Sequence, residues 1–456
     1  MEDVMRFTIL IPTLNRADVL PAALATCVSQ ADPELEILVS DNASADHTHS
    51  VVESFTDPRI RYINPGKQLG MPEHWEFALS HVGPGYVSVL GDDDGFLPDA
   101  IVRARAIIKQ LRVEAVAWRK AEYHWPDHIL PGYRNWLQIP ARQGVDVFES
   151  RNVLSDVLSF LRTYTDLPCI YNSFVATDVL DVIRRRSNGR LLPCITPDAY
   201  SGIAISGVID QYAFSWRPLS VNAASRHSNG TIASYRGVRD GEALKHFTSS
   251  KEDVHSQLAR CSSVPVLIAD AALAAQANLP IARGWPTVDM QAMLRLAVQF
   301  AEHRPIEVYE ETMEALEVIA SQNSLMPYWE QVRSRSVHVG APELQPIGWN
   351  QQGDSLVIDG NSFGLQDVAD AAVCVALVLD ELGGTPSTGA AARMDARSPV
   401  QPGTSSPASR QDWSKLVVEL LSLRPKAPRG RVHRYWRAVR RRLLALISRA
   451  REGGSA

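Results

Sequence analysis

Short strand-like segments alternate with helical segments near the start of the chain, and this alternation restricts the fold more than any other feature. Strand-like runs at 7–12, 35–40 and 60–64 are each followed by polar residues and then by a helical pattern, and a fourth run follows at 87–90. Such alternation is typical of a parallel sheet with crossover helices on its faces. We therefore predict an α/β fold with a Rossmann-like, mostly parallel sheet flanked by helices.

Polar side chains stand at the end of each predicted strand. Thr13, Asn15 and Arg16 follow the first strand, Asp41 and Asn42 the second, Asn64 the third and Asp92–Asp94 the fourth. In an open parallel sheet, ligands bind beyond the carboxyl ends of the strands. The four strand ends are therefore expected to converge on one crevice.

The acidic triplet Asp92–Asp94 concentrates like charge at the end of an apolar strand. Adjacent carboxylates cannot all stay ionised without a counter-ion. Mg²⁺ and Mn²⁺ take oxygen ligands and bridge protein carboxylates to phosphate oxygens. The triplet predicts a divalent cation and a diphosphate-bearing substrate, although a solvated acidic turn before a helix would give the same residues.

Four segments, in their order along the chain, resemble the family-2 group of nucleotide-sugar glycosyltransferases with the GT-A fold. The resemblance covers roughly the first half of the chain and implies the same fold there. The segments are Ile9–Arg16, Ile37–Asp46, Gly70–Leu79 and Leu90–Asp94 with Pro98.

The resemblance implies roles for residues of the first two segments and of the acidic triplet. Pro12, Thr13 and Arg16 would line the nucleotide pocket, and Asp41 would contact the base. The triplet Asp92–Asp94 would be the DxD-type element that holds the metal and the ribose.

Within the triplet, we assign Asp94 to the metal and Asp92 to the ribose side or the metal, with Asp93 as a substitute in donor binding. The commoner family form has an acidic residue where Gly91 stands in this chain. This departure leaves open which two of the three carboxylates act.

Asp198 is the candidate catalytic base. It lies between Pro197 and an apolar helical run, about a hundred residues after the triplet. In this position, it resembles the catalytic base of the family. A carboxylate near the acceptor hydroxyl would take its proton during inverting transfer. Alternatively, Asp198 is only an acid in the first turn of that helix.

Other basic and polar loop residues are weaker candidates. His227 resembles the C-terminal histidine with which some GT-A enzymes complete the coordination of Mn²⁺, but a solvated loop histidine would look the same. Lys67 and Arg226 could contact the diphosphate, and Asn64 would join the nucleotide-sugar site.

Composition limits the remaining possibilities. A net charge of −5 argues against a general nucleic-acid binder. The five cysteines are scattered and odd in number, so they predict neither a disulfide framework nor a zinc site. The chain shows no signal peptide and no apolar run long enough to span a bilayer, so we expect a cytoplasmic protein.

The periodicity divides the chain into five regions. Residues 1–235 form the predicted GT-A domain, with a nucleotide-sugar half at about 1–125 and an acceptor half at about 126–235. Residues 236–340 show helical periodicity. The remaining regions are a small α/β unit without an assigned role at 341–382, a disordered linker at 383–410 and a basic amphipathic tail at 411–456.

The tail has the pattern of an interfacial helix. Seven arginines lie between Arg429 and Arg442, and apolar residues recur at spacings of three and four up to residue 447. Such a helix lies on anionic lipid, so residues 429–447 predict peripheral contact with the inner face of the cytoplasmic membrane. A partner-docking helix or a solvated tail is the alternative.

The resemblance implies a metal-dependent, inverting glycosyltransferase. It would use Mn²⁺ or Mg²⁺ and move a sugar from a nucleoside-diphosphate-sugar donor to a hydroxyl of a glycan or lipid-linked acceptor, in surface polysaccharide or glycoconjugate synthesis. A sugar nucleotidyltransferase, or a non-catalytic nucleotide- or glycan-binding module, remains the alternative.

Overall fold

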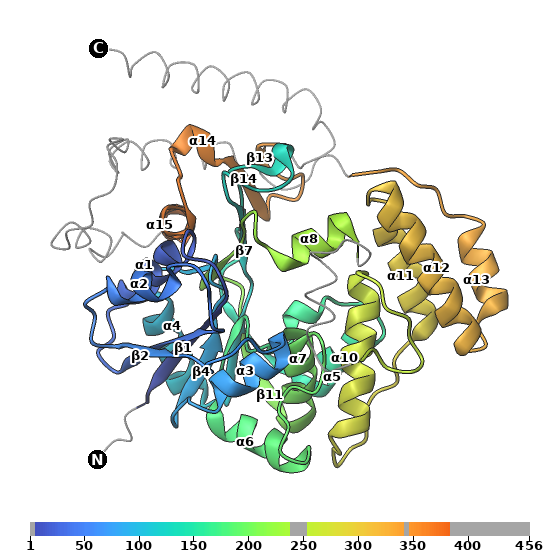
Figure 1. Cartoon of the computed structure of the whole chain (residues 1–456), viewed down its shortest axis with the longest axis horizontal. Helices are drawn as coiled ribbons and strands as arrows, with labels where there is room; N and C mark the ends of the chain where they lie inside the picture. The colour runs from blue at the N-terminus through green and yellow to red at the C-terminus, as the bar shows by residue number, and fades with distance from the viewer. Residues whose placement is uncertain (1–4, 238–252, 342–345, 384–456) are drawn as a thin grey trace.

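An eight-stranded sheet lies at the centre of the computed structural model, which describes residues 5–237, 253–341 and 346–383 (Figure 1). The strand order is β3-β2-β1-β4-β10-β6-β11-β9, in which β3, β2, β1 and β4 are parallel neighbours and β10 is antiparallel to β4 and β6. The strands are β1 (Phe7–Thr13), β2 (Leu35–Asp41), β3 (Ile60–Ile63), β4 (Tyr86–Val89), β6 (Ala115–Trp118), β9 (Val145–Glu149), β10 (Ser173–Ala176) and β11 (Gln211–Ser215).

Helices cover this sheet, and the predicted α/β fold is confirmed. Nearly every residue of β1 and β2 is buried, as expected of parallel strands that lie between two layers of helices. The helices of this part are α1 (Leu20–Val28), α2 (Thr48–Glu53), α3 (Met71–Leu79), α4 (Ala100–Leu111), α5 (Ser150–Leu158), α6 (Thr177–Arg186), α7 (Pro197–Val208) and α8 (Asn229–Arg236).

A second, six-stranded sheet has the order β13-β14-β8-β7-β12-β5. β14 pairs antiparallel with β8, so the small unit predicted for 341–382 adds two strands to a sheet that earlier segments begin. The helix α15 (Val368–Gly383) packs on α1 and β12 over this sheet. The strands are β5 (Gly95–Phe96), β7 (Ala121–His124), β8 (Trp136–Pro140), β12 (Ser220–Ala224), β13 (Gly348–Trp349) and β14 (Ser355–Asp359), with the short helix α14 (Gly360–Phe363) after them.

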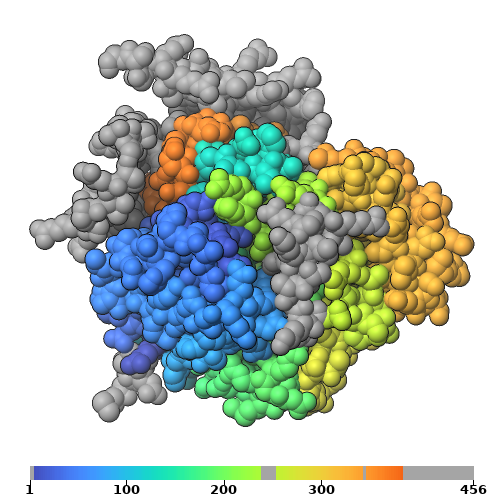
Figure 2. Space-filling model, viewed as in Figure 1, coloured from blue at the N-terminus to red at the C-terminus, as the bar shows by residue number. Residues whose placement is uncertain are grey.

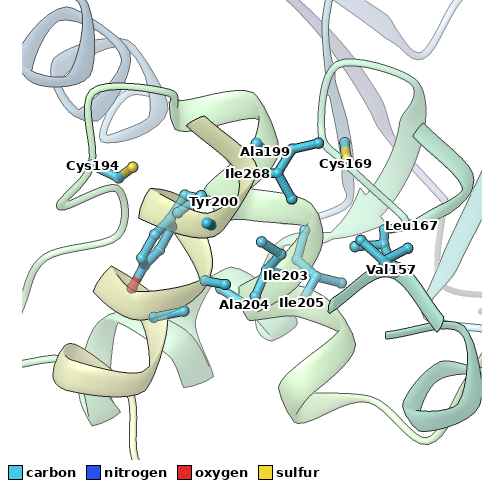
Figure 3. Close-up of a cluster of buried hydrophobic side chains, with 14 of the residues drawn as sticks. Val157, Leu167, Cys169, Cys194, Ala199, Tyr200, Ile203, Ala204, Ile205 and Ile268 are labelled. Atoms are coloured by element: carbon cyan, nitrogen blue, oxygen red, sulfur yellow. The ribbon is translucent and has the colours of Figure 1, made fainter. Parts of the chain in front are cut away.

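The helical C-terminal region is also confirmed, and it shares a core with the sheet domain. α10 packs along α7, and Ile268 of α10 lies with Tyr200 and Ile203 of α7 in one buried cluster (Figure 3). The helices that follow α10 form one side of the molecule, beside the sheet domain (Figure 2). The helices of this region are α10 (Val264–Asn278), α11 (Met290–Ala301), α12 (Ile306–Gln322) and α13 (Met326–Arg333).

Two predicted segments lie outside the described residues. These are the tail at 411–456 and, apart from its first residue, the linker at 383–410. Within the part of the chain that the structure describes, no helix is both long enough and apolar enough to cross a membrane.

Candidate functional site

A cavity of about 500 Å³ lies at the carboxyl ends of β1, β2 and β4. The strand register brings these ends together, because Thr13 of β1 pairs with Asp41 of β2 and Leu10 pairs with Val89 of β4. The N-terminal ends of α7, α8 and α10 close the opposite side of the cavity. It is thus bounded by both the sheet domain and the helical region.

Six of the residues predicted for the site line this cavity, and six do not. Lining residues come from the first strand end, the acidic triplet and the start of α7: Pro12, Thr13, Arg16, Asp92, Asp93 and Asp198. The predicted residues outside the lining are Asp41, Asn64, Lys67, Asp94, Arg226 and His227, of which Asn64, Lys67 and Arg226 are exposed.

Asp94 points into the protein and joins the triplet loop to β12. Its Oδ1 accepts a hydrogen bond from the Ala223 amide (2.6 Å), and its Oδ2 accepts from the Tyr171 hydroxyl (2.5 Å) and the Gly91 amide (3.2 Å). Burial and the neighbouring charge of Asp93 raise the pKa of Asp94 to about 7. Asp94 therefore holds the loop in place.

Asp93 also anchors this loop, whereas Asp92 faces a cation. Asp93 Oδ2 accepts from the amide (3.0 Å) and hydroxyl (2.7 Å) of Ser225. The guanidinium of Arg16 lies 4.0 Å from Asp92 Oδ1. Burial raises the pKa of Asp92 to about 6 although the charge of Arg16 opposes the shift. One arginine thus compensates the charge of Asp92 only in part.

The structure explains why glycine stands at position 91. A Cβ atom there would collide with the Tyr171 hydroxyl and would lie 2.7 Å from Asp94 Oδ2. Tyr171 therefore fills the space that an acidic side chain at this position would need.

Gly91→Ala is expected to displace Tyr171 and to lower the free energy of unfolding by about 1–3 kcal/mol, as overpacking of a buried site does. Donor affinity should fall with it, because Asp92 and Asp93 move with the loop. Thermal unfolding and donor titration measure both effects. Gly83→Ala is the control, since a Cβ there meets nothing within 4 Å. Equal stability of the two variants would contradict this explanation.

Asp198 lies in the first turn of α7 and also lines the cavity, so its structural role and its predicted catalytic role are compatible. The Tyr164 hydroxyl donates a hydrogen bond to Asp198 Oδ2 (3.1 Å). The charge of Asp198, together with burial, raises the pKa of Tyr164 well above its usual value. Tyr164 thus stays a neutral donor that orients the carboxylate.

The helix that carries Asp198 is held rigidly on two sides. α10 covers one side (Figure 3). On another side, Gly202 of α7 lies so close to Cys169 that a Cβ atom would collide with its sulfur. A carboxylate on a packed helix keeps its position better than one on a loop.

At the end of β2, the cavity is lined by Asn42 rather than Asp41. Asp41 Oδ2 accepts from the Tyr62 hydroxyl (2.6 Å), which in turn accepts from the Asn64 side chain (3.2 Å). The Asn42 side chain donates to Leu69 O and accepts from Leu69 N, both at 2.9 Å. Asp41, which was predicted to contact the nucleobase, is therefore the neighbour of the residue that lines the cavity.

His227 contacts a carboxylate outside the cavity lining. Its Nε2 lies 2.8 Å from Asp18 Oδ2, to which Arg226 donates at 2.6 Å. Burial would raise the pKa of Asp18, but the hydrogen bond with His227 and the charge of Arg226 lower it overall. Across the described residues, no group of three or more His, Cys, Asp or Glu side chains could hold a metal ion.

Lys120 is a lining residue that the sequence reasoning missed. Its Nζ donates to Asn222 Oδ1 (2.9 Å) and lies 5.2 Å from the centre of the Tyr171 ring. Lys120 follows β6, so the rule that polar residues at strand ends form the site could have found it. Tyr164 and Tyr171 also line the cavity, but they lie in segments without this pattern.

The first part of the chain is similar in sequence to known glycosyltransferases. Residues 8–153 match the family model of glycosyl transferase family 2. A Campylobacter jejuni GalNAc(5)-diNAcBac-PP-undecaprenol beta-1,3-glucosyltransferase is 33% identical over 99 residues, which are 21% of this chain and 32% of that protein. The Rhizobium meliloti succinoglycan biosynthesis protein ExoO is 27% identical over 103 residues, 23% of this chain and 30% of that protein.

These matches span about a third of the length of each relative. Among solved structures, S. aureus TarS 1-349 with UDP-GlcNAc aligns at 14% identity with a TM-score of 0.44, covering 72% of this chain and 92% of that one. The family resemblance seen in the sequence is confirmed. Residues 8–153 therefore match glycosyl transferase family 2 in sequence.

Proposed function

We propose that this protein is a metal-dependent, inverting glycosyltransferase that moves a sugar from a nucleoside-diphosphate-sugar donor to an acceptor hydroxyl. The observation that carries the proposal is that Asp198 and Asp92 line one cavity at the strand ends of a family 2 domain. Metal-dependent transfer from a diphosphate donor needs a general base, here Asp198, and a carboxylate that can bind a cation, here Asp92.

In this reaction, Asp198 accepts the proton of the acceptor hydroxyl while its oxygen attacks the anomeric carbon. The new bond forms as the bond from the anomeric carbon to the diphosphate oxygen breaks, which inverts the configuration. Tyr164 holds one oxygen of Asp198 through its hydrogen bond. The other oxygen is then the one that meets the acceptor.

Arg16 and Lys120 are the cationic side chains that line the described cavity wall, and both are placed to contact the donor diphosphate. Asp92 would hold a divalent cation. Asp94, which the family resemblance implies as a metal ligand, lies outside the cavity lining and would instead hold the loop that carries Asp92. When bound, the cation offsets the charge that develops on the leaving diphosphate. Because Mg²⁺ sites use one or two carboxylates plus substrate phosphates, a site with few protein ligands fits this role.

The acceptor is proposed to be a growing surface glycan or a lipid-linked sugar. The names of two relatives, a GalNAc(5)-diNAcBac-PP-undecaprenol beta-1,3-glucosyltransferase and a succinoglycan biosynthesis protein, support this class. The cytoplasmic location and the membrane contact through 429–447 belong to the same proposal, and the latter segment lies outside the described residues.

A panel of UDP-, GDP- and dTDP-sugars, with Mn²⁺, Mg²⁺ or a chelator, tests the function. We expect one donor to raise the thermal stability in the presence of metal, by about 2.7 kcal/mol at a hundredfold excess over its Kd. Transfer of its sugar should then proceed with inversion. Binding without transfer to any glycan acceptor would favour a non-catalytic module, and release of diphosphate from a nucleoside triphosphate would favour a nucleotidyltransferase.

A further inference from the structure

A second, much smaller pocket of about 20 Å³ adjoins the catalytic cavity. Ser234, Ser262 and Val264 line both, so the pocket opens beside the cavity on the side of the helical region. Arg304 and Thr312 are among its other lining residues. Its residues come from α8, the start of α10 and the α11–α12 hairpin, and none comes from the predicted nucleotide-binding strands.

Ser263, at the N-terminus of α10, supplies an unused hydroxyl to this pocket. The residue is only 8% exposed, and its buried Oγ has no hydrogen-bond partner among the described residues. Although Ser263 precedes a helix of 15 residues, its side chain does not cap that helix. A buried hydroxyl without a partner costs free energy, which a bound acceptor of hydrogen bonds would recover.

Two positive electrostatic features meet at the same place. The first-turn amides of α10 carry the positive end of the helix dipole, which favours an anion. Arg304 lies over the Tyr235 ring at 5.0 Å and forms no ion pair with a carboxylate in the described ranges. The nearby carboxylate of Glu311 is outside the pocket lining and lies against Gly237 instead.

We infer that this pocket binds a phosphate group of the acceptor, and this inference rests on the proposed transferase function. The pocket has room for about one water-sized group, so it can take one oxygen of a phosphate whose other oxygens lie toward the larger cavity, and it is too small for a sugar ring. The guanidinium fork of Arg304 matches phosphate geometry. The acceptor hydroxyl would then lie in the larger cavity next to Asp198, with its phosphate held by the helical region.

Inorganic phosphate is the probe for a calorimetric test on the full chain. We expect Arg304→Gln to weaken phosphate binding by about tenfold or more, the usual loss for a hydrogen bond to a charged group. Arg295→Gln removes the same charge from the exposed face of α11 and should leave the affinity unchanged. The titration is repeated with saturating nucleoside diphosphate, and binding that persists assigns the site to the acceptor rather than the donor.

Ser263→Ala provides a second variant whose folding is not at risk. Because the Ser263 hydroxyl has no partner in the described structure, its loss should leave the melting temperature of the free protein unchanged or raised, yet weaken phosphate binding several-fold. Phosphate affinities within twofold of wild type in both variants would overturn the inference. Since the titration needs no sugar transfer, failure of the donor panel would reject the proposed function without changing this result.

Discussion

Asp198→Asn is expected to lower the rate of sugar transfer by about 10²–10⁴-fold, the usual contribution of a general base. Donor affinity should stay within about twofold, because the base acts only after the donor has bound. The amide keeps the size of the carboxylate and can still accept the hydrogen bond of Tyr164. Single-turnover transfer and donor titration separate the two effects.

The chain offers a matched control for the helix-capping alternative. Asp178 occupies the same second position of α6 that Asp198 occupies in α7, but it is exposed. Asp178→Asn therefore removes the same favourable charge at a helix N-terminus and should cost about 0.3–1 kcal/mol of stability without an effect on transfer. If the two variants lose stability equally and both retain transfer, Asp198 is only a first-turn acid.

The sequence indicated the sheet and the location of the site because both follow from local periodicity. Strand ends at Thr13, Asp41 and Asp92 were predicted to converge, and the parallel register brings β1, β2 and β4 to one edge. What the periodicity could not indicate is which side chain at each end faces the cavity. At the end of β2, a difference of one residue puts Asn42 in the wall and Asp41 behind it.

Features that depend on distant segments escaped the sequence reasoning. β14 joins β8 across more than two hundred residues, with Ile358 opposite Leu137, and nothing local to either strand encodes that pairing. The same holds for the small pocket, which is lined together by residues of α8, the start of α10 and the α11–α12 hairpin. These contacts are set by tertiary burial and not by the local pattern.

The second large effect is expected from substitutions in the acidic triplet. Replacing Asp92 and replacing Asp94 should have different effects on donor binding and stability. Asp92→Asn removes the lining carboxylate that faces Arg16. We expect it to abolish the metal-dependent part of donor binding and to slow transfer by about 10²-fold or more, since a catalytic cation supplies several kcal/mol of charge stabilisation. Its melting temperature without ligand should not fall, because removing a buried, incompletely compensated charge relieves repulsion from Asp93.

Asp94→Asn should instead cost stability. Its carboxylate accepts from the Ala223 amide and from Tyr171, and an amide NH₂ group cannot accept at both places, so one buried donor loses its partner at about 1–3 kcal/mol. Thermal unfolding with and without Mn²⁺ and donor distinguishes the two responses. The exposed Asp181→Asn on α6 controls for the change in net charge. Should Asp94→Asn abolish the Mn²⁺ effect with full stability, while Asp92→Asn retains it, the metal belongs to Asp94 and Asp92 serves only to hold Arg16.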